Sequence, residues 1–554
     1  MRTTARTDLD ALLEGLSKKK SDWLAVGVPE RLTLLRACMK GITDVAERWV
    51  LDGCAIKGLD PKGPSSGEEW FGGPVVTMRN LRLLVTALES GGAPMPTRLR
   101  KHTSGAIIAD VLASGAYEGA LFAGHRAEVW IEPGKPPTQG RIYRGPKRTT
   151  GAVCVVLGAG NVSSIPFMDA LYKLFAEDEV VLVKVNPVNE YVGPLLERAF
   201  APLISAGYLA VAYGGANEGA ILCEHALCDT LHVTGSDRTY DAVVWGADPE
   251  ERARRKKQGD RKNTRPFTAE LGCVTPVLVV PGPWSKADLS FQAKHVAAMV
   301  ANNGSFNCNA AKVVVVAKGW VQRQAFLTEL EQALAKTPPR RAYYPGAQDR
   351  FRAFLEHYPQ ADPVGPTGEN VVPWTLVPDV APKHGEYALT SEAFCGVLAT
   401  TSLEANEPAE FLTRAVRFAN EDCWGTLSCM MLAHPSTMES FEPEIDRAIT
   451  ELRYGCIGVN AWAGMGYALG SMTWGAYPGH APEDIQSGVG VVHNSMLFDH
   501  PRKSVVHAPF RPLAKPAYFS DHRTAHTLGR ALLAHEAAPS LRTLARVMLA
   551  GARG

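Results

Sequence analysis

The sequence predicts an α/β fold in which helices cover a largely parallel sheet. From residue 148 onward, short apolar runs alternate with stretches of helical periodicity, and this alternation is typical of parallel winding. Three of the apolar runs end in turns of glycine and small polar residues. A lone cysteine, Cys308, follows a helix-like run and precedes the apolar run 313–316, with asparagine on each side. These features predict a binding site at the carboxyl ends of the strands and a thiol at a loop elbow.

The composition is that of an ordinary globular protein. With 554 residues, 46% apolar and 21% charged, the chain is long enough for two or three domains. A net charge of +1 creates no global field, so we expect neither a nucleic acid nor a membrane as partner. The eleven cysteines have neither zinc-site spacing nor a disulfide framework, so no metal site is predicted and a reducing compartment is favoured. Because the first residues lack an apolar signal and no run approaches a membrane span, the predicted location is the cytoplasm.

The first 120 residues contain no recognisable chemistry. Apolar residues at helical spacing predict helices over 32–50 and 78–88, joined by a Pro- and Gly-containing loop at 61–67, and residues 1–120 as a whole are predicted to be mostly helical. Two strand-like runs, 127–131 and 139–144, lie on either side of a proline-rich turn and predict a β-hairpin.

The next section predicts the parallel sheet. The expected strands are 153–157, 180–185, 209–213 and 230–233, and the expected helices between them are 166–175, 195–204 and 219–225. The turns at 158–161, 213–215 and 234–236 would lie along one edge of this sheet, where cofactors bind, and glycine and serine leave backbone N–H groups free for a phosphate. Each turn taken alone also fits an ordinary connection between a strand and a helix.

A basic run follows, with eight arginines and lysines between residues 252 and 265. Such runs are usually solvated surface segments. The alternative is a clamp for a phosphorylated group on a substrate or cofactor.

The chemistry of the sequence is concentrated in Cys308 and Glu270. A thiol at a loop elbow becomes a strong nucleophile when its surroundings favour the thiolate, whereas a cysteine of unknown role is most often a small buried apolar residue. The polar neighbours of Cys308 argue against burial. Glu270 precedes the apolar run 277–280, so the carboxylate and the thiol can meet if the strands 277–280 and 313–316 share a sheet.

After Cys308 the alternation of strands and helices continues to the end of the chain. The expected elements are a helix at 325–334, α/β structure through 386–400, a helix at 411–420, a strand at 427–432, an aromatic glycine-rich loop after 454–460, a last strand at 504–508 and a helical tail at 520–554. Trp462 and Tyr467 in the aromatic loop, with Phe306, suggest an apolar or aromatic substrate, although they are equally compatible with a core.

In this order, these pieces resemble the aldehyde dehydrogenase superfamily over roughly residues 20 to 510. Each match is short, but eight in the family's order are hard to obtain by chance. The matching segments are Asn161, Lys184-Val-Asn-Pro187, Gly214-Gly215, Val233-Thr-Gly-Ser236, Glu270-Leu-Gly-Cys273, Asn303 to Ala310, Glu392-Ala-Phe-Cys-Gly396, and Asn420 followed by Gly425-Thr-Leu427.

The resemblance implies an aldehyde dehydrogenase-like fold, with a Rossmann-type nucleotide-binding domain, an α/β catalytic domain and a small bridging β-sheet that normally mediates dimerisation. We therefore expect a homodimer or homotetramer. The expected parts are an N-terminal helical part of the nucleotide-binding domain (1–124), a bridging and oligomerisation hairpin (125–147), the Rossmann-type NAD(P)-binding domain (148–270), the catalytic cysteine domain (271–475), a C-terminal bridging strand (476–519) and an extra helical tail (520–554).

The resemblance also implies roles for individual residues in the oxidation of a small-molecule aldehyde by NAD or NADP. Cys308 would attack the aldehyde, Asn161 and the backbone N–H of Cys308 would hold the oxyanion, and Glu270 would activate water. The predicted cofactor-binding residues are Lys184 at the adenine ribose, Ser236 with Gly215, Thr234 and Gly235 near the pyrophosphate, and Glu392 with Phe394 at the nicotinamide end.

The sequence also departs from the family pattern. Pro187 replaces the acidic residue that usually binds the ribose hydroxyls, Cys273 replaces the second glycine after Glu270, and Tyr240 replaces a further glycine. Two alternatives to aldehyde oxidation therefore stay open. One is an acyl-CoA or acyl-phosphate reductase of the same fold, in which the basic run grips the carrier. The other is a catalytically silent scaffold, against which the joint presence of Cys308, Asn161, Glu270 and Glu392 argues.

Overall fold

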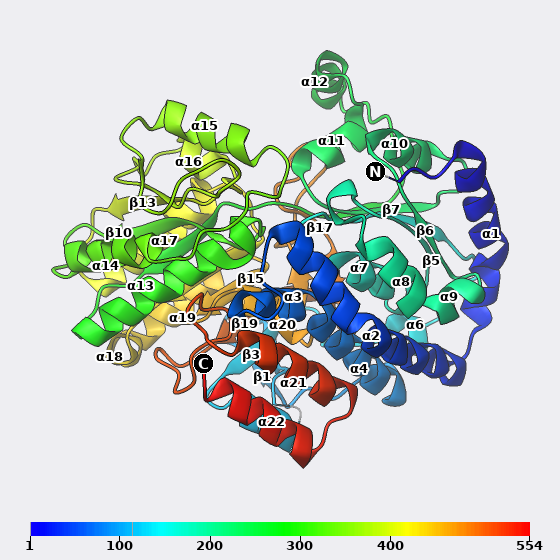
Figure 1. Cartoon of the computed structure of the whole chain (residues 1–554), viewed down its shortest axis with the longest axis horizontal. Helices are drawn as coiled ribbons and strands as arrows, with labels where there is room; N and C mark the ends of the chain where they lie inside the picture. The colour runs from blue at the N-terminus through cyan, green and yellow to red at the C-terminus, as the bar shows by residue number, and fades with distance from the viewer. Residues whose placement is uncertain (1, 114) are drawn as a thin grey trace.

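A computed structural model describes residues 2–113 and 115–554 and contains two large β-sheets, each covered by helices. A six-stranded sheet and the N-terminal helices occupy one half of the molecule, and an eleven-stranded sheet extends through the other half (Figure 1). This arrangement confirms the predicted α/β fold.

The six-stranded sheet has the order β17-β8-β7-β4-β5-β6. Its strands are β4 (Val153–Leu157), β5 (Val180–Lys184), β6 (Leu209–Ala212), β7 (Thr230–Thr234), β8 (Phe267–Glu270) and β17 (Gly488–Val489). The connecting helices include α7 (Ile165–Phe175), α8 (Val192–Ala199), α9 (Ala201–Ser205), α10 (Ala216–Glu224), α11 (Asp237–Trp245), α12 (Pro249–Gln258) and the short η3 (Pro187–Asn189). All neighbouring pairs from β6 to β8 are parallel, so their carboxyl ends lie at one edge, as predicted.

The N-terminal helices pack on this sheet. Leu13 and Trp23 of α1, Trp49 of α2 and Leu84 of α4 belong to one buried cluster with the strands. The elements are α1 (Arg6–Ala25), α2 (Val28–Lys57), η1 (Pro64–Ser66), α3 (Gly67–Trp70), the π-helical turn η2 (Phe71–Val75), α4 (Val76–Glu89) and α5 (Ala116–Leu121). The section up to residue 120 is mostly helical, as predicted, with one departure after α4. Two strands, β1 (Arg98–Lys101) and β2 (Ile107–Asp110), form an antiparallel pair there.

The eleven-stranded sheet carries the cysteine loop. Its order is β1-β2-β3-β19-β15-β14-β9-β10-β13-β12-β11. Its strands beyond β2 are β3 (Arg126–Ile131), β9 (Thr275–Val279), β10 (Ala311–Ala317), β11 (Asp362–Pro363), β12 (Thr375–Val377), β13 (Val397–Leu403), β14 (Ser428–Leu432), β15 (Cys456–Val459) and β19 (Pro501–His507). Strands β9 and β10 are parallel neighbours, so the apolar runs after Glu270 and after Cys308 do share a sheet.

Helices cover both faces of this sheet, and a small two-stranded sheet lies beside it. The helices are α13 (Lys286–Ala301), η4 (Asn302–Ser305), α14 (Arg323–Ala335), α15 (Ala347–His357), α16 (Tyr387–Thr390), α17 (Pro408–Glu421), α18 (Pro435–Ser440), α19 (Glu442–Glu451) and α20 (Gly464–Leu469). The two-stranded sheet pairs β16 (Trp474–Gly475) with β18 (Val491–His493). The predicted helices at 325–334 and 411–420 correspond to α14 and α17.

The expected bridging strands pair with each other and form one end of the large sheet. Strand β3 runs antiparallel to β19, with Val505 opposite Glu128, and β19 continues into the sheet by pairing with β15. The second strand of the predicted hairpin, 139–144, is wrong, because this segment forms α6 (Arg141–Arg144) and a single bridge to Phe498. Both edges of β3 are already occupied by β2 and β19, so no edge is free to pair with it. The homodimer or homotetramer stays a prediction.

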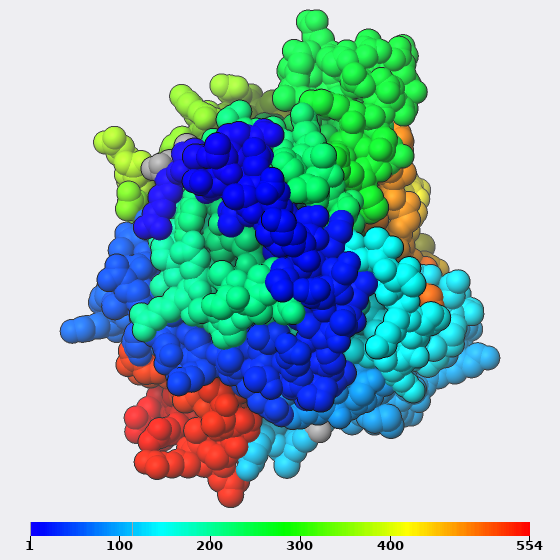
Figure 2. All heavy atoms as spheres, turned by 90° about the vertical axis from the view of Figure 1, so that its right-hand side faces the viewer, coloured from blue at the N-terminus to red at the C-terminus, as the bar shows by residue number. Residues whose placement is uncertain are grey.

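The chain ends in two helices, α21 (Ala525–Ala537) and α22 (Leu541–Gly551), which confirms the predicted helical tail. Helix α21 packs against α3 and α4, and α22 packs against α21 and α5. Figure 2 shows the tail, in red, directly below the N-terminal helices, in blue. Within the described residues, every helix is too short or too polar to cross a membrane.

Candidate active site

Cys308 lies in the loop between α13 and β10, and the loop owes its shape to three consecutive residues with positive φ. These residues are Asn303 (φ 54°), Gly304 (φ 66°) and Ser305 (φ 71°). The left-handed region favours glycine and tolerates asparagine, so the Asn-Gly pair is the local cause of this turn. All eleven cysteines lie in the described part of the chain, and Cys308 is the one that is not buried. The polar neighbours of Cys308 therefore identified its partial exposure correctly.

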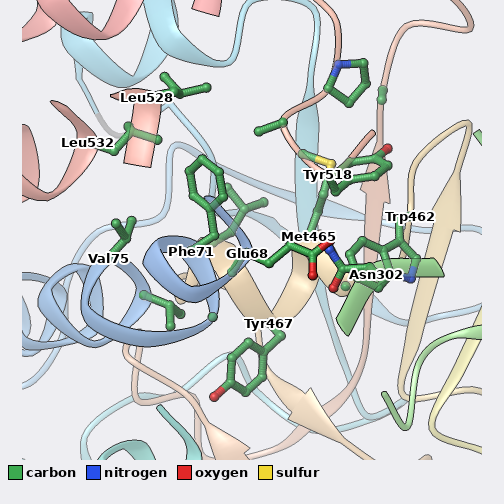
Figure 3. A pocket seen from close by; sticks show the side chains of 18 of the residues that line it. Glu68, Phe71, Val75, Asn302, Trp462, Met465, Tyr467, Tyr518, Leu528 and Leu532 are labelled. Atoms are coloured by element: carbon green, nitrogen blue, oxygen red, sulfur yellow. The ribbon is translucent and has the colours of Figure 1, made fainter. Parts of the chain in front are cut away.

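Cys308 opens into a cavity of about 840 Å³, which is within the range of small-molecule binding sites. Glu270, Asn303 and Asn307 line this cavity together with the aromatic side chains of Trp462 and Tyr467. The indole N–H of Trp462 donates to the Asn309 carbonyl at 2.9 Å, which fixes this end of the cavity next to the cysteine loop. Figure 3 shows Asn302, Trp462 and Tyr518 at the same end.

Glu270 contacts the thiol directly. The Cys308 Sγ donates to Glu270 Oε1 across 3.3 Å, and the Trp474 indole N–H donates to the same oxygen at 3.2 Å. Burial raises the pKa of Glu270 to about 8, against the opposing effect of these two hydrogen bonds. Burial and the nearby Glu270 carboxylate also raise the pKa of the Cys308 thiol well above its usual value. The thiol and the carboxyl group are thus in direct contact, and the Glu270 carboxylate disfavours the thiolate form of Cys308, whereas the hydrogen bond from the thiol favours the charged form of Glu270.

Asn161 reaches the same loop from the end of β4. Its side-chain amide donates to the Phe306 carbonyl at 2.9 Å, and its backbone carbonyl accepts from Asn303 Nδ2 at 2.9 Å and from the Tyr343 hydroxyl at 3.1 Å. The structure therefore places Asn161 beside the loop, where one amide hydrogen holds the Phe306 carbonyl and the second is left to donate. Tyr343, which the sequence did not single out, also bonds Asn303 Oδ1 at 3.0 Å.

Lys312 is a site residue that the sequence reasoning missed. Its ammonium is buried and donates to the backbone carbonyls of Asn307, Cys308 and Ala310 at 3.1, 3.1 and 3.2 Å. It also forms an ion pair with Glu392 Oε1 at 3.3 Å. A buried charge needs such partners, and here they fix the backbone on either side of the thiol. The available signal was a lysine at the start of the apolar strand β10.

Glu392 and Phe394 lie against the segments that follow Glu270 and surround Cys308. Glu392 Oε1 accepts from the Cys273 backbone N–H at 3.3 Å. A Cβ at Gly272 would lie 2.2 Å from Glu392 Oε2, so this glycine is required for the approach. The Phe394 ring lies 5.7 Å from that of Phe306. The predicted nicotinamide-end residues are therefore brought to the cysteine loop.

The predicted nucleotide-binding residues lie along the carboxyl edge of the six-stranded sheet. Lys184 ends β5, and its buried ammonium has one hydrogen bond within the described residues, to the Val185 carbonyl at 3.3 Å. Burial lowers the pKa of Lys184, with a smaller opposing effect from Glu218. Ser236 caps the N-terminus of α11. A buried amine with one long contact and a capped helix opening at the same edge fit the ribose and phosphates of a nucleotide.

Other residues of the predicted cofactor set already have internal partners. The Gly215 backbone N–H donates to Glu218 Oε2 at 2.7 Å, and the Thr234 hydroxyl donates to Asp169 Oδ2 at 3.0 Å. The Gly235 backbone N–H donates to the Glu270 backbone carbonyl at 3.0 Å, which joins this turn to the backbone of Glu270. Gly235 and Thr234 therefore position the site in this structure, and their contact with a cofactor stays a prediction.

The basic run forms an exposed helix and its flanks. Arg254 and Arg255 pair with Glu251, Lys256 with Asp241 and Lys262 with Glu224. In Figure 1, α12 projects from the top of the molecule, and residues 246–265 take no part in lining the cavity. These contacts support the interpretation of a solvated surface segment. Within the described residues, no three His, Cys, Asp or Glu side chains are grouped so that they could hold a metal ion.

Comparisons with known proteins identify the fold. No protein-family model and no curated protein matches the sequence. Solved structures do match over most of the chain, each at a probability of 1.00. The aldehyde dehydrogenase KauB from Pseudomonas aeruginosa superposes with a TM-score of 0.62 at 16% identity, over 91% of this chain and 89% of KauB.

Two further structures give the same result. The indole-3-acetaldehyde dehydrogenase AldA of P. syringae, in complex with NAD+ and IAA, matches at a TM-score of 0.61 and 16% identity, over 91% of this chain and 90% of AldA. The NADP-dependent glyceraldehyde-3-phosphate dehydrogenase from Bacillus halodurans C-125, complexed with NADP, matches at a TM-score of 0.61 and 15% identity, over 91% of this chain and 92% of the dehydrogenase. The chain therefore has the fold of the aldehyde dehydrogenase superfamily, as its motifs predicted, at a low identity that fits a divergent sequence.

Proposed function

We propose that this protein oxidises an aldehyde to a carboxylic acid with NAD or NADP as hydride acceptor. The observation that carries the proposal is the 3.3 Å contact between the Cys308 Sγ and Glu270 Oε1 on the wall of a ligand-sized cavity. A nucleophile with a base in hydrogen-bond reach is the arrangement that acyl-transfer chemistry requires.

The chain's own groups support each step of this reaction. Cys308 Sγ gives its proton to Glu270, which returns it to solvent before hydrolysis, and bonds to the aldehyde carbon, which leaves a negative charge on the former carbonyl oxygen. The Cys308 backbone N–H and the remaining amide hydrogen of Asn161 are the donors available to that oxygen. A bound nicotinamide nucleotide would accept the hydride that leaves this carbon, and the acyl group would then remain on Cys308 as a thioester. Glu270 then takes a proton from water, whose oxygen attacks the resulting thioester and releases the acid and the thiol.

The pKa of Glu270 predicts a pH profile. A carboxyl whose pKa is raised to about 8 is neutral below that pH and acts as a base only above it. Steady turnover limited by hydrolysis should therefore rise with pH and level off above about pH 8, and near pH 6 only about a hundredth of Glu270 is ionised. Trp474→Phe removes a hydrogen bond that favours the charged form, so its profile should shift to higher pH. A flat profile between about pH 6 and 9, or a midpoint near 4.5, would contradict the assignment of the base.

Pro187 predicts tolerance of NADP. It begins the turn η3 directly after β5, where a glutamate would repel a 2′-phosphate. We expect NADP to be accepted at least as readily as by family members that carry the acidic residue, and Pro187→Glu to raise the Kd of NADP with little change for NAD. Fluorescence titration with both reduced cofactors measures this, with Val188→Glu, one residue further along, as the control for added charge. A wild-type protein that binds NAD but not NADP would show that another group excludes the phosphate.

A panel of aldehydes with either cofactor tests the reaction itself. Formation of the reduced cofactor is followed by its ultraviolet absorbance, with and without coenzyme A or phosphate. We expect oxidation without coenzyme A or phosphate, because Glu270 can activate water as the acyl acceptor, whereas a thiol acceptor needs little help from a base. Strict dependence on coenzyme A or phosphate would favour the acyl-CoA or acyl-phosphate reductase. Absence of turnover in either direction with every substrate would favour the silent scaffold.

A further inference from the structure

The cavity at Cys308 extends to the C-terminal tail. Leu528 and Leu532 of α21 and Val547 and Met548 of α22 line the same cavity as Cys308. Figure 3 shows Leu528 and Leu532 on one side, across from Asn302, Trp462 and Tyr518. The tail therefore forms a wall of the proposed active-site cavity at the end remote from the cysteine loop.

The surface between these two ends is apolar. Val75 lies next to the tail residues, and Phe71 and then Met465 follow towards the cysteine loop (Figure 3). Several of the charged side chains that also line the cavity form ion pairs within the chain. Lys57 pairs with Glu69 at 2.7 Å, and Glu68 pairs with Arg340. A ligand that reaches from Cys308 to the tail thus meets mainly hydrocarbon.

A buried ion-pair network fixes the tail to the body of the protein. Glu536 of α21 forms ion pairs with Arg79 at 2.8 Å and with Arg82 at 2.7 Å, both from α4. Burial opposes ionisation of Glu536, but Arg79 and Arg82 outweigh it and hold its pKa below the usual value. The network ties two segments that are 457 residues apart in the sequence.

Close helix packing fixes the same contact. A Cβ at Gly529 would lie 2.4 Å from the Cβ of Trp70, and a Cβ at Gly67 would lie 2.5 Å from the Cβ of Ala525. Glycine on each side therefore allows α21 to approach α3 at a distance that no other residue permits. Tight packing on α3 therefore fixes the position of α21 and of the cavity wall that it forms.

We infer that the α21–α22 hairpin is a specificity element that selects aldehydes with a long apolar chain. This inference rests on the proposed aldehyde oxidation. The formyl group would lie at Cys308, and the far end of the chain would contact Leu528, Leu532 and Val547. Each methylene that enters this apolar wall strengthens transition-state binding, so kcat/KM should rise by about fourfold per added methylene until the tail is reached.

The test compares propanal, hexanal and decanal as substrates of the full chain. Leu532→Trp adds bulk to the wall at a half-buried position, and Leu541→Trp adds the same bulk to the same tail at an exposed position (73%) outside the cavity. We expect Leu532→Trp to lower kcat/KM for decanal at least about tenfold more than kcat/KM for propanal, which is too short to reach the tail, and Leu541→Trp to behave as the wild type. Continued oxidation of propanal by Leu532→Trp also shows that this variant folds.

A binding measurement separates this inference from the proposed reaction. Calorimetric titration with decan-1-ol, a neutral analogue that needs no turnover, should show binding to the wild type and weaker binding to Leu532→Trp. If decanol binds in this way but no aldehyde is oxidised, the proposed aldehyde oxidation is wrong, whereas the inference that the tail binds an apolar chain is supported. If aldehydes are oxidised but Leu532→Trp affects propanal and decanal equally, or decanol does not bind, the inference about the tail is overturned.

Discussion

Replacing Cys308 by serine is expected to lower aldehyde oxidation by at least ~10³-fold while leaving the binding of NAD and NADP unchanged. Serine can keep the hydrogen bond to Glu270, so the geometry of the site should persist. Its hydroxyl ionises far less readily than a thiol and is a much weaker nucleophile. Steady-state rates and cofactor titrations on the same preparation measure the two effects separately.

Cys228 provides a matched control. Its buried thiol donates to the Thr230 carbonyl at 3.3 Å, a bond that a serine hydroxyl retains, and it lies outside the cavity. Cys228→Ser should therefore keep nearly full activity. Full activity in Cys308→Ser, by contrast, would remove Cys308 from the reaction.

Replacing Glu270 by glutamine is expected to stall the enzyme after the first turnover. The amide oxygen can still accept from Trp474, but it cannot take a proton from water. General-base assistance is typically worth ~10²–10⁴-fold, so the first reduced cofactor should appear as a burst, followed by turnover slowed by about that factor. A stopped-flow trace of cofactor absorbance gives the size of the burst and the slow rate together.

The same variant distinguishes water from other acceptors. A thiol needs little help from a base, so addition of coenzyme A would restore rapid turnover if coenzyme A were the natural acceptor. We expect the burst to persist without rescue. Steady turnover at the wild-type rate in water alone would show that Glu270 is only structural.

The sequence predicted the parallel core closely because its signals are local. The valine-rich run that became β10 and the strand that became β4 each needed only apolar periodicity to be recognised, and their ends agree within one or two residues. The contact between Cys308 and Glu270 followed from one further step, that β9 and β10 share a sheet. Family motifs in order then placed Asn161 beside the same loop.

The missed features depend on contacts between distant segments. Strand β1 reads Arg-Leu-Arg-Lys and has mostly exposed side chains, so neither apolarity nor alternation marks it as a strand. The segment 139–144 has strand-like residues, but β3 offers it no free edge. Lys312 became recognisable only when its three carbonyl partners were in place. The tail wall likewise requires α21 to lie against α4, which no local pattern predicts.

The central claim is that Cys308 carries the acyl group during turnover, and intact-protein mass spectrometry of Glu270→Gln tests it most directly. The variant is mixed with an aldehyde and NAD or NADP, quenched in acid and weighed, with Cys308→Ser treated in parallel. We expect Glu270→Gln to gain the mass of one acyl group, located on the peptide that contains Cys308, and Cys308→Ser to gain nothing. An acyl group on another residue, or reduced cofactor formed without any adduct in Glu270→Gln, would contradict the account.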